Sequence, residues 1–276
     1  MDVLKESALV IVGLFINYLK ERHIMTDNVL WSGKVDAKAE QGVNTGKTLK
    51  AGDIITITAS GWIKLGKEDY TLAAPQGAIP RDGSLTASKH VVLKAKIGST
   101  EQPVGNSLYR WTVPTDGELV LVVVDGAGKY TDNSGSFDAV VYQEVSNAKK
   151  GEWKGRVDAT NSNWTKTGVT VNKGDKISVA ASGIAQYDRN GRSFGPDGDS
   201  QHPSAQQRDP NFVCPDAIAG TLIIQVGSQS YGIGSGEFDW PAPESGEIAF
   251  IFNDINPATE YQNNTGGYDV KLIVKG

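Results

Sequence analysis

The chain has 276 residues, enough for about two ordinary domains, with 21% charged residues and a formal net charge of -5. Acidic and basic side chains are mixed along the chain without a lysine or arginine cluster, which argues against a nucleic-acid partner. Cys214 is the only cysteine, so no disulfide can form within the chain, and its stability must come from packing or from bound metal.

The first 28 residues differ in character from the rest of the chain. Residues 8–19 form an apolar run that is too short to span a bilayer, so no membrane span is expected. Acidic residues, Asp2 and Glu6, stand where a signal peptide carries positive charge, and no small-residue cleavage site follows. We expect residues 1–28 to form a helical extension of unknown role, amphipathic or oligomer-forming, unless translation starts at Met25.

The remaining sequence is a tandem repeat. The segment WSGKVDA at residues 31–37 returns as WKGRVDA at residues 153–159. Further matches in the same order are Gly-Asp at 52–53 and 174–175, Ala-Ser-Gly at 59–61 and 181–183, Trp at 111 and 240, and Asp at 125 and 254. Internal repetition on this scale predicts two copies of one domain.

The second copy is longer than the first in two polar stretches, one between residues 183 and 240 and one after Asp254. Insertions at these places indicate loops that grew between fixed strands, and such loops commonly carry recognition. The repeat predicts domains at residues 29–145 and 151–276, joined near residues 146–152.

Short β-rich runs bounded by Gly, Asn, Asp and Pro recur in both copies, and helical patterns do not. The predicted strands are residues 53–59, 91–97, 119–124 and 137–142 in the first copy, and residues 176–180, 222–226, 248–252 and 268–274 in the second. We therefore expect an all-β protein of two tandem antiparallel β-sandwiches. The tryptophans that recur in register are expected to pack in the core or between sheets; they are Trp31, Trp111, Trp153 and Trp240.

Each copy ends with a strand, an acidic residue, a short loop and a pair of side-chain oxygens. These residues are Asp125, Asp132 and Asn133 in the first copy, and Asp254, Asn263 and Asn264 in the second. Hard oxygen donors without nitrogen or sulfur suit Ca²⁺. Either loop alone is more typical of an ordinary turn, because Asn and Gly favour turns. Retention of the distant aspartate in both copies, despite different loop lengths, favours one calcium ion per domain.

On these residues the chain resembles the calcium-dependent galactose-binding bacterial lectins of the PA-I (LecA) type. The likeness covers both repeats, and it includes the opening Trp153-Lys154-Gly155 and the string FGPDGDSQHP at residues 194–203, which is similar to the family's G-P-x-G-D-x-x-H-P loop. The resemblance implies a jelly-roll-like sandwich and sugar binding through a bridging calcium ion. It also implies cytoplasmic synthesis without a conventional signal peptide, with release or surface association by another route.

For the second domain, the resemblance implies metal ligands by position. They would be the carbonyl of Tyr187, the carboxylate of Asp254, a loop carbonyl at Thr259 or Glu260, and the side chains of Asn263 and Asn264. Two vicinal hydroxyls of galactose would complete the coordination shell.

The resemblance also implies a set of sugar contacts in the second domain. They would be His202 on the primary hydroxyl, Gln206, Gln207, Asp254, Ile255 and Asn263, with Phe194 as a stacking candidate. The two glutamines lie in an expanded loop, residues 204–211, which either contacts a second sugar of an oligosaccharide or is a solvated loop without a role. Trp164 has no counterpart in the first copy and is expected to be a surface aromatic.

The first copy departs further from the family pattern. By position its metal ligands would be the carbonyls of Leu65 and Lys129 and the side chains of Asp125, Asp132 and Asn133. The segment 75–83 lacks the histidine that would contact a primary hydroxyl. We therefore expect this domain to bind calcium and to accept either a 6-deoxy sugar such as fucose or no sugar.

The function expected from these features is a non-catalytic lectin for galactose- or fucose-containing glycans on cell surfaces. One alternative is a structural or toxin-associated module in which calcium only rigidifies loops. A glycosidase would need two carboxylates flanking one bond, and neither repeat offers a second matched acid that is spare from metal binding. The sequence leaves the oligomeric state open, including a homo-oligomer.

Overall fold

The computed structural model describes residues 28–67, 72–78, 93–144, 149–187, 193–199, 209–255 and 259–276. The helical extension predicted for residues 1–28 lies outside the described residues, except for Asn28. In the described part the regular elements are β-strands and two short 3₁₀ turns, η2 (Tyr130–Asp132) and η3 (Glu260–Asn263). No helix among these residues has the length and apolar character needed to cross a membrane.

The first repeat forms two antiparallel sheets. One sheet has the order β1 (Val29–Asp36), β10 (Ser134–Gln143), β3 (Ile54–Lys64), β4 (Leu72–Ala74) and β5 (Gly77–Ala78), and β8 (Ser107–Thr112) also pairs with β3. The other has the order β2 (Val43–Leu49), β9 (Gly117–Val123), β6 (Leu93–Ile97) and β7 (Thr100–Pro103).

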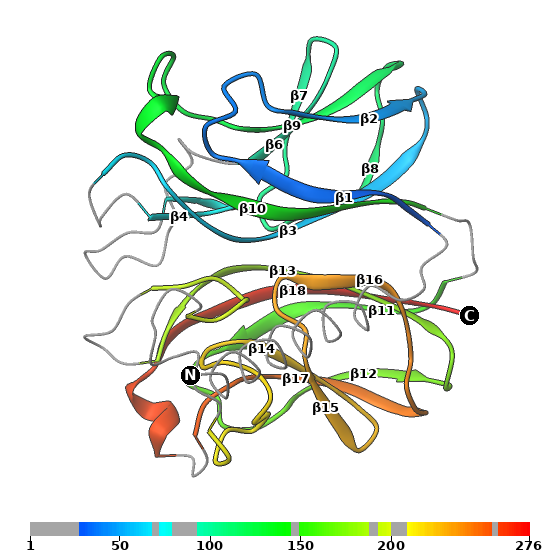
Figure 1. Ribbon diagram of the computed structural model, residues 1–276. Coiled ribbons are helices and arrows are strands. Elements are labelled where there is room, and N and C mark those ends of the chain that lie inside the picture. The colour runs from blue at the N-terminus through cyan, green and yellow to red at the C-terminus, as the bar shows by residue number, and fades with distance from the viewer. Residues whose placement is uncertain are drawn as a thin grey trace, which may run out of the picture.

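The second repeat forms the corresponding two sheets. One has the order β11 (Lys149–Asp158), β18 (Thr265–Lys275), β13 (Lys176–Gln186) and β16 (Gly236–Pro241). The other has the order β12 (Thr165–Val171), β17 (Gly246–Phe252), β14 (Leu222–Val226) and β15 (Gln229–Gly232). Figure 1 shows four layers, with the β1-containing and β11-containing sheets facing each other and the other two sheets outside. The prediction of two tandem all-β sandwiches is confirmed.

Several predicted boundaries differ from the structure. The strands β3 and β13 run past their predicted ends to Lys64 and Gln186, because β10 and β18 continue to pair with them over that length. The second half of the predicted junction at residues 146–152 is strand rather than linker, since β11 begins at Lys149.

Each sandwich has its own apolar core, and the tryptophan of the repeated W-x-G motif is a partly buried residue that packs against it. Trp31 packs against the first core and Trp153 against the second, where its ring lies 5.7 Å from that of Phe250. A Cβ atom at Gly33 would lie 2.6 Å from the Trp31 ring, so the glycine leaves room for the indole. Trp111 and Trp240 also pack against the cores, as predicted for all four matched tryptophans.

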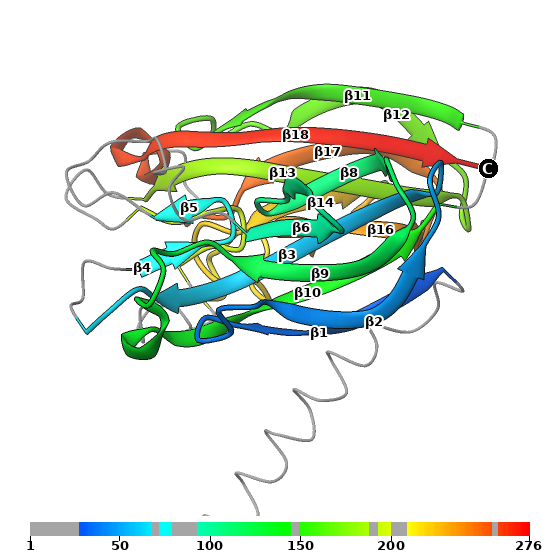
Figure 2. The same cartoon turned by 90° about the horizontal axis from the view of Figure 1, so that it is seen from above.

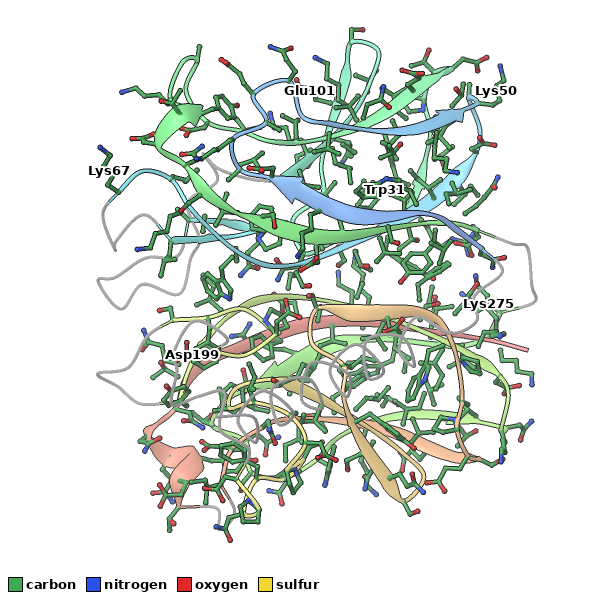
Figure 3. The ribbon with its side chains drawn as sticks, in the orientation of Figure 1. Trp31, Lys50, Lys67, Glu101, Asp199 and Lys275 are labelled. Atoms are coloured by element: carbon green, nitrogen blue, oxygen red, sulfur yellow. The ribbon has the colours of Figure 1, made fainter. Side chains whose placement is uncertain are left out.

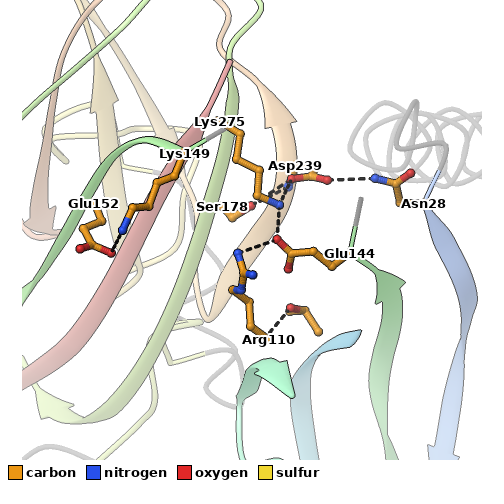
Figure 4. Close-up of polar contacts among 9 residues, drawn as sticks. Asn28, Arg110, Glu144, Lys149, Glu152, Ser178, Asp239 and Lys275 are labelled. Atoms are coloured by element: carbon orange, nitrogen blue, oxygen red, sulfur yellow. Dashed lines mark hydrogen bonds and ion pairs between the residues drawn. The ribbon is translucent and has the colours of Figure 1, made fainter. Parts of the chain in front are cut away.

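A buried charge cluster joins the two inner sheets (Figure 4). The Lys275 ammonium forms an ion pair at 2.5 Å with Glu144 and lies 3.5 Å from an Asp239 oxygen. A guanidinium nitrogen of Arg110 donates to the same Glu144 oxygen at 2.9 Å. The side chains of Lys275 and Glu144 are only 1% and 5% exposed. Two domains that share no strand pairing in the described part are thus connected by desolvated charges.

These charges occupy matching positions in the two repeats and have opposite signs. Arg110 and Asp239 each precede a matched tryptophan, and both have positive φ, at 52° and 50°. Glu144 and Lys275 also occupy matching positions. The Glu144 N–H donates to the Ile54 carbonyl just beyond the last pair of β10 with β3, and Lys275 is the last residue of β18, paired with Lys176 of β13. Glu144 and Lys275 are therefore matching residues of the two repeats that contact each other across the interface.

Candidate functional site

The predicted metal ligands of each domain gather where an outer strand leads through a 3₁₀ turn into an inner strand. Asp125 lies two residues after β9, and Asp254 lies two residues after β17. The turns η2 and η3 follow, and a single asparagine, Asn133 or Asn264, separates each turn from β10 or β18. Both turns lie at the same end of the four-layer molecule, at the left in Figures 1 and 2.

In the second domain the Asp254 carboxylate is held by two donors. The Asn264 amide nitrogen donates to one oxygen at 2.7 Å and also to the Ala159 carbonyl at 3.0 Å. The Ile255 N–H donates to the other carboxylate oxygen at 2.7 Å. Burial raises the pKa of the Asp254 carboxyl above its usual range.

The first domain repeats this arrangement. The Asn133 amide nitrogen donates to Asp125 at 3.0 Å and to the Ala37 carbonyl at 3.0 Å. The Gly126 N–H donates to the other oxygen of Asp125 at 2.7 Å. The sequence-predicted aspartates and asparagines are therefore in direct contact in both domains.

Both asparagines leave one atom unpaired. Because each amide nitrogen donates to an aspartate and to a backbone carbonyl, its orientation is fixed, and the Oδ1 atom must point elsewhere. Within the described residues, the Oδ1 atoms of Asn133 and Asn264 are buried and have no hydrogen-bond donor. A buried oxygen without a donor costs about 1–3 kcal/mol, so its occurrence at two matched positions indicates a missing partner.

A hard cation would fit this donor set. Among the described residues no group of three or more His, Cys, Asp or Glu side chains gathers. The second-domain site instead has the Asp254 carboxylate beside amide oxygens, and the first-domain site has the Asp125 carboxylate beside the Asn133 amide, with Asp132 exposed on η2. Ca²⁺ accepts carboxylate, amide and backbone carbonyl oxygens together. The unpaired Oδ1 atoms of Asn133 and Asn264 are the atoms that such a cation would satisfy.

The carbonyl donors predicted at Leu65 and Tyr187 lie beside these asparagines. The register pairs Ser134 with Lys64 and Thr265 with Gln186, so the next position along each ladder brings Leu65 opposite Asn133 and Tyr187 opposite Asn264. The other predicted metal ligands are exposed side chains on the two turns, namely Lys129, Asp132, Thr259, Glu260 and Asn263.

A matched tyrosine anchors each turn, and the sequence analysis did not identify it. The Tyr261 hydroxyl donates to the Phe252 carbonyl at 2.9 Å, and the Tyr130 hydroxyl donates to the Val123 carbonyl at 3.1 Å. Burial raises the pKa of Tyr261, so its hydroxyl stays a donor. The recurrence of tyrosine three residues before the buried asparagine was the available signal.

The predicted sugar contacts are only partly within the described structure. His202, Gln206 and Gln207 lie outside the described residues, and Ile255 is half-buried beside Asp254. The structure contradicts the stacking role expected for Phe194, because this side chain is fully buried.

The ring of Phe194 faces the interior of the second sandwich. Its centroid lies 5.3 Å from that of Tyr187 and 6.2 Å from that of Phe252. The Tyr187 hydroxyl in turn donates to Asp199 at 2.8 Å. Asp199, which is labelled in Figure 3, belongs to the same GPDGD string. The string therefore folds its aromatic residue into the core and keeps the turn in place by a buried carboxylate.

Comparisons with known proteins identify the family of both repeats. Residues 30–146 and 152–276 each match the family described as PA-IL-like protein. Lectin A of Photorhabdus laumondii subsp. laumondii is 43% identical over 114 residues, which are 41% of this chain and 92% of that protein. A solved structure described as "EclA N-terminal domain; PllA-like lectin" is 51% identical and covers 43% of this chain and 100% of its own, with a TM-score of 0.42. The chain therefore belongs to the PA-IL-like family, and it is a carbohydrate-binding lectin that carries the family's domain twice.

Proposed function

We propose that the chain is a calcium-dependent lectin whose second domain binds galactose-type glycans. The observation that carries this proposal is the pair of matched, buried and unpaired Oδ1 atoms of Asn133 and Asn264, each beside an aspartate. Bound calcium would supply a positive charge that attracts vicinal sugar hydroxyls. In the second domain it would be held by Asp254, Asn263, Asn264, the Tyr187 carbonyl, and a carbonyl at Thr259 or Glu260.

The surrounding residues keep this site rigid before a sugar arrives. The Asp254 carboxylate is fixed by the Ile255 N–H and by Asn264, and Tyr261 ties the turn to β17. A site that is ordered in advance loses less conformational entropy on binding. In the proposal Asp254 also accepts a hydrogen bond from a ring hydroxyl, and His202 contacts the primary hydroxyl.

The first domain has the same buried pair but a different rim. Asp132 stands where the second domain has Asn263, which adds a negative charge beside the proposed cation. We propose that this domain binds calcium and that, without the histidine, it accepts a 6-deoxy sugar such as fucose or no sugar.

The full-length Asp254→Asn variant makes the sugar preference of the first domain measurable. With the second site disabled, titration with methyl fucoside and methyl galactoside in calcium is expected to show either preference for fucoside or no binding. A preference for galactoside in this variant would overturn the proposal for the first domain.

The placement of both turns at one end suits multivalent binding (Figure 2). Two sites that face the same way can engage one glycan-bearing surface at the same time, which raises avidity without new contacts. A cell surface with many galactose- or fucose-containing glycans is therefore the proposed partner.

A glycan array probed with and without EDTA tests the proposed function. In millimolar calcium the chain is expected to bind galactose-terminated glycans, and EDTA is expected to abolish this binding. Retention in EDTA would contradict the calcium requirement. Absence of any glycan binding in calcium would favour a structural module with calcium-stabilised loops.

A further inference from the structure

An open cavity of about 510 Å³ lies beside the candidate calcium loop of the second domain. This volume falls in the range of roughly 300–1,000 Å³ that small-ligand sites occupy. The residues that line it include Ser162, Trp164, Pro210, Asn211, Phe212 and Tyr261. Trp164, expected from the sequence to be a surface aromatic, is half-buried and packs against the core while lining this cavity.

Backbone hydrogen bonds connect the wall of the cavity to the candidate calcium site. The Val213 N–H donates to the Asp254 carbonyl at 3.2 Å, and Phe212 forms a β-bridge with Ile255. Tyr261, which also lines the cavity, belongs to η3. The cavity and the proposed galactose site therefore share a backbone boundary.

The cavity depends on two features that distinguish the second repeat from the first. One is Trp164. Thr167 and Gly168 of the second repeat match Thr45 and Gly46 of the first, so the position of Trp164 is taken by Gly42 in the first repeat. The other is the segment 209–213, which belongs to the stretch that is longer in the second copy. At Gly42 a Cβ would lie 2.7 Å from the Val120 side chain, so a large residue has no room there.

The chemistry of the lining selects a neutral ligand with an apolar face and hydroxyl groups. The rings of Trp164 and Phe212 are half-buried, and Ser162 and Asn211 offer hydrogen-bonding groups beside them. No charged side chain of the described residues lines the cavity. A sugar ring has one face of C–H groups that packs on an aromatic ring and hydroxyls around its edge that meet polar groups.

We propose that this cavity is a subsite for the second sugar ring of a galactose-terminated oligosaccharide. The inference rests on the proposed function, because it assumes that the terminal galactose occupies the neighbouring calcium site. It makes the second domain selective for oligosaccharides over simple galactosides, and it assigns Trp164 as the residue that sets this selectivity.

Calorimetric titration of the full chain in calcium tests the proposal. The ligands are methyl galactoside and three disaccharides with terminal galactose: lactose, melibiose and Galα1-3Gal. At least one disaccharide is expected to bind more tightly than methyl galactoside. Trp164→Ala should weaken binding of that disaccharide roughly 5- to 10-fold and leave methyl galactoside unchanged. Trp164→Phe should retain most of the advantage because it keeps an aromatic face.

Each outcome decides between the two proposals. Val29→Ala, which alters an exposed side chain of the other domain, serves as the control, and thermal melting verifies that each variant is folded. Equal binding of all four ligands by the unaltered chain, or an equal loss for all four ligands in Trp164→Ala, would overturn the subsite. Failure of methyl galactoside to bind in calcium would instead overturn the proposed function.

Discussion

Replacing Lys275 by methionine is expected to lower the free energy of unfolding by about 3 kcal/mol. The substitution removes the cation that lies between Glu144 and Asp239 in the interface and leaves their carboxylates buried with less compensation. Arg110 remains beside Glu144, so the loss falls at the lower end of the range for a broken buried ion pair. For a chain of this size the melting temperature should fall by roughly 6–12 °C, measured by calorimetry or circular dichroism.

An exposed lysine offers a matched control. Lys34 pairs with Asp138 at 2.8 Å, but the two side chains are 68% and 62% exposed, so Lys34→Met should cost less than about 1 kcal/mol. Adding Glu144→Gln to Lys275→Met should recover part of the lost stability, because it removes an uncompensated buried charge. Equal effects of the two lysine substitutions would show that the interface cluster contributes no more than a surface ion pair.

The opposite charges of Glu144 and Lys275 also influence which inner sheets can pack against each other. Since Glu144 and Lys275 occupy matching positions and touch each other, pairing of two first repeats in the same geometry would bring Glu144 against Glu144. Pairing of two second repeats would bring Lys275 against Lys275. Like charges in a desolvated interface are strongly unfavourable, so the inner sheet of each repeat favours the other repeat of the tandem.

Much of the fold could be predicted from the sequence because the same strand pattern occurs twice. The eight predicted runs all contain strands, whereas the other strands, β1 and β11 among them, were not predicted. In β11 the alternation places Trp153, Gly155 and Val157 on one face, and the glycine interrupts the apolar period. Its role became visible only when the indole ring was seen to lie over it.

The candidate metal site could be predicted because repetition kept residues that lie far apart in the chain. Asp254 and Asn264 flank the turn between β17 and β18, which are consecutive strands in different sheets, and this connection brings the two side chains to 2.7 Å. The direction in which a loop side chain points leaves no comparable pattern in the sequence. The sequence therefore did not predict that Phe194 packs in the core. The interface cluster joins residues as distant as Glu144 and Lys275, and only the folded arrangement shows that they touch.

The substitution Asp254→Asn is expected to reduce calcium-dependent galactose binding at least about 100-fold, which exceeds the roughly 10- to 100-fold loss typical of changes around a metal ligand. It removes the one buried carboxylate of the proposed second-domain site while keeping the size of the side chain. Burial disfavours the charged form of Asp254, but an amide can accept from only one of the two N–H donors that hold the carboxylate, so the melting temperature in EDTA should change little. The decisive comparison is the rise in melting temperature that calcium causes, which should become smaller in the variant.

The matched substitution in the first domain, Asp125→Asn, separates the two sites. It should also reduce the calcium-induced rise in melting temperature, because Asp125 is held by Asn133 and Gly126 as Asp254 is by Asn264 and Ile255. It should leave galactose affinity intact, since the proposed galactose site lies in the second domain. Calcium titration by calorimetry should therefore give two sites in the unaltered chain and one in each variant. Full galactose binding by Asp254→Asn in calcium would refute the assignment, because no other carboxylate is proposed to hold the cation there.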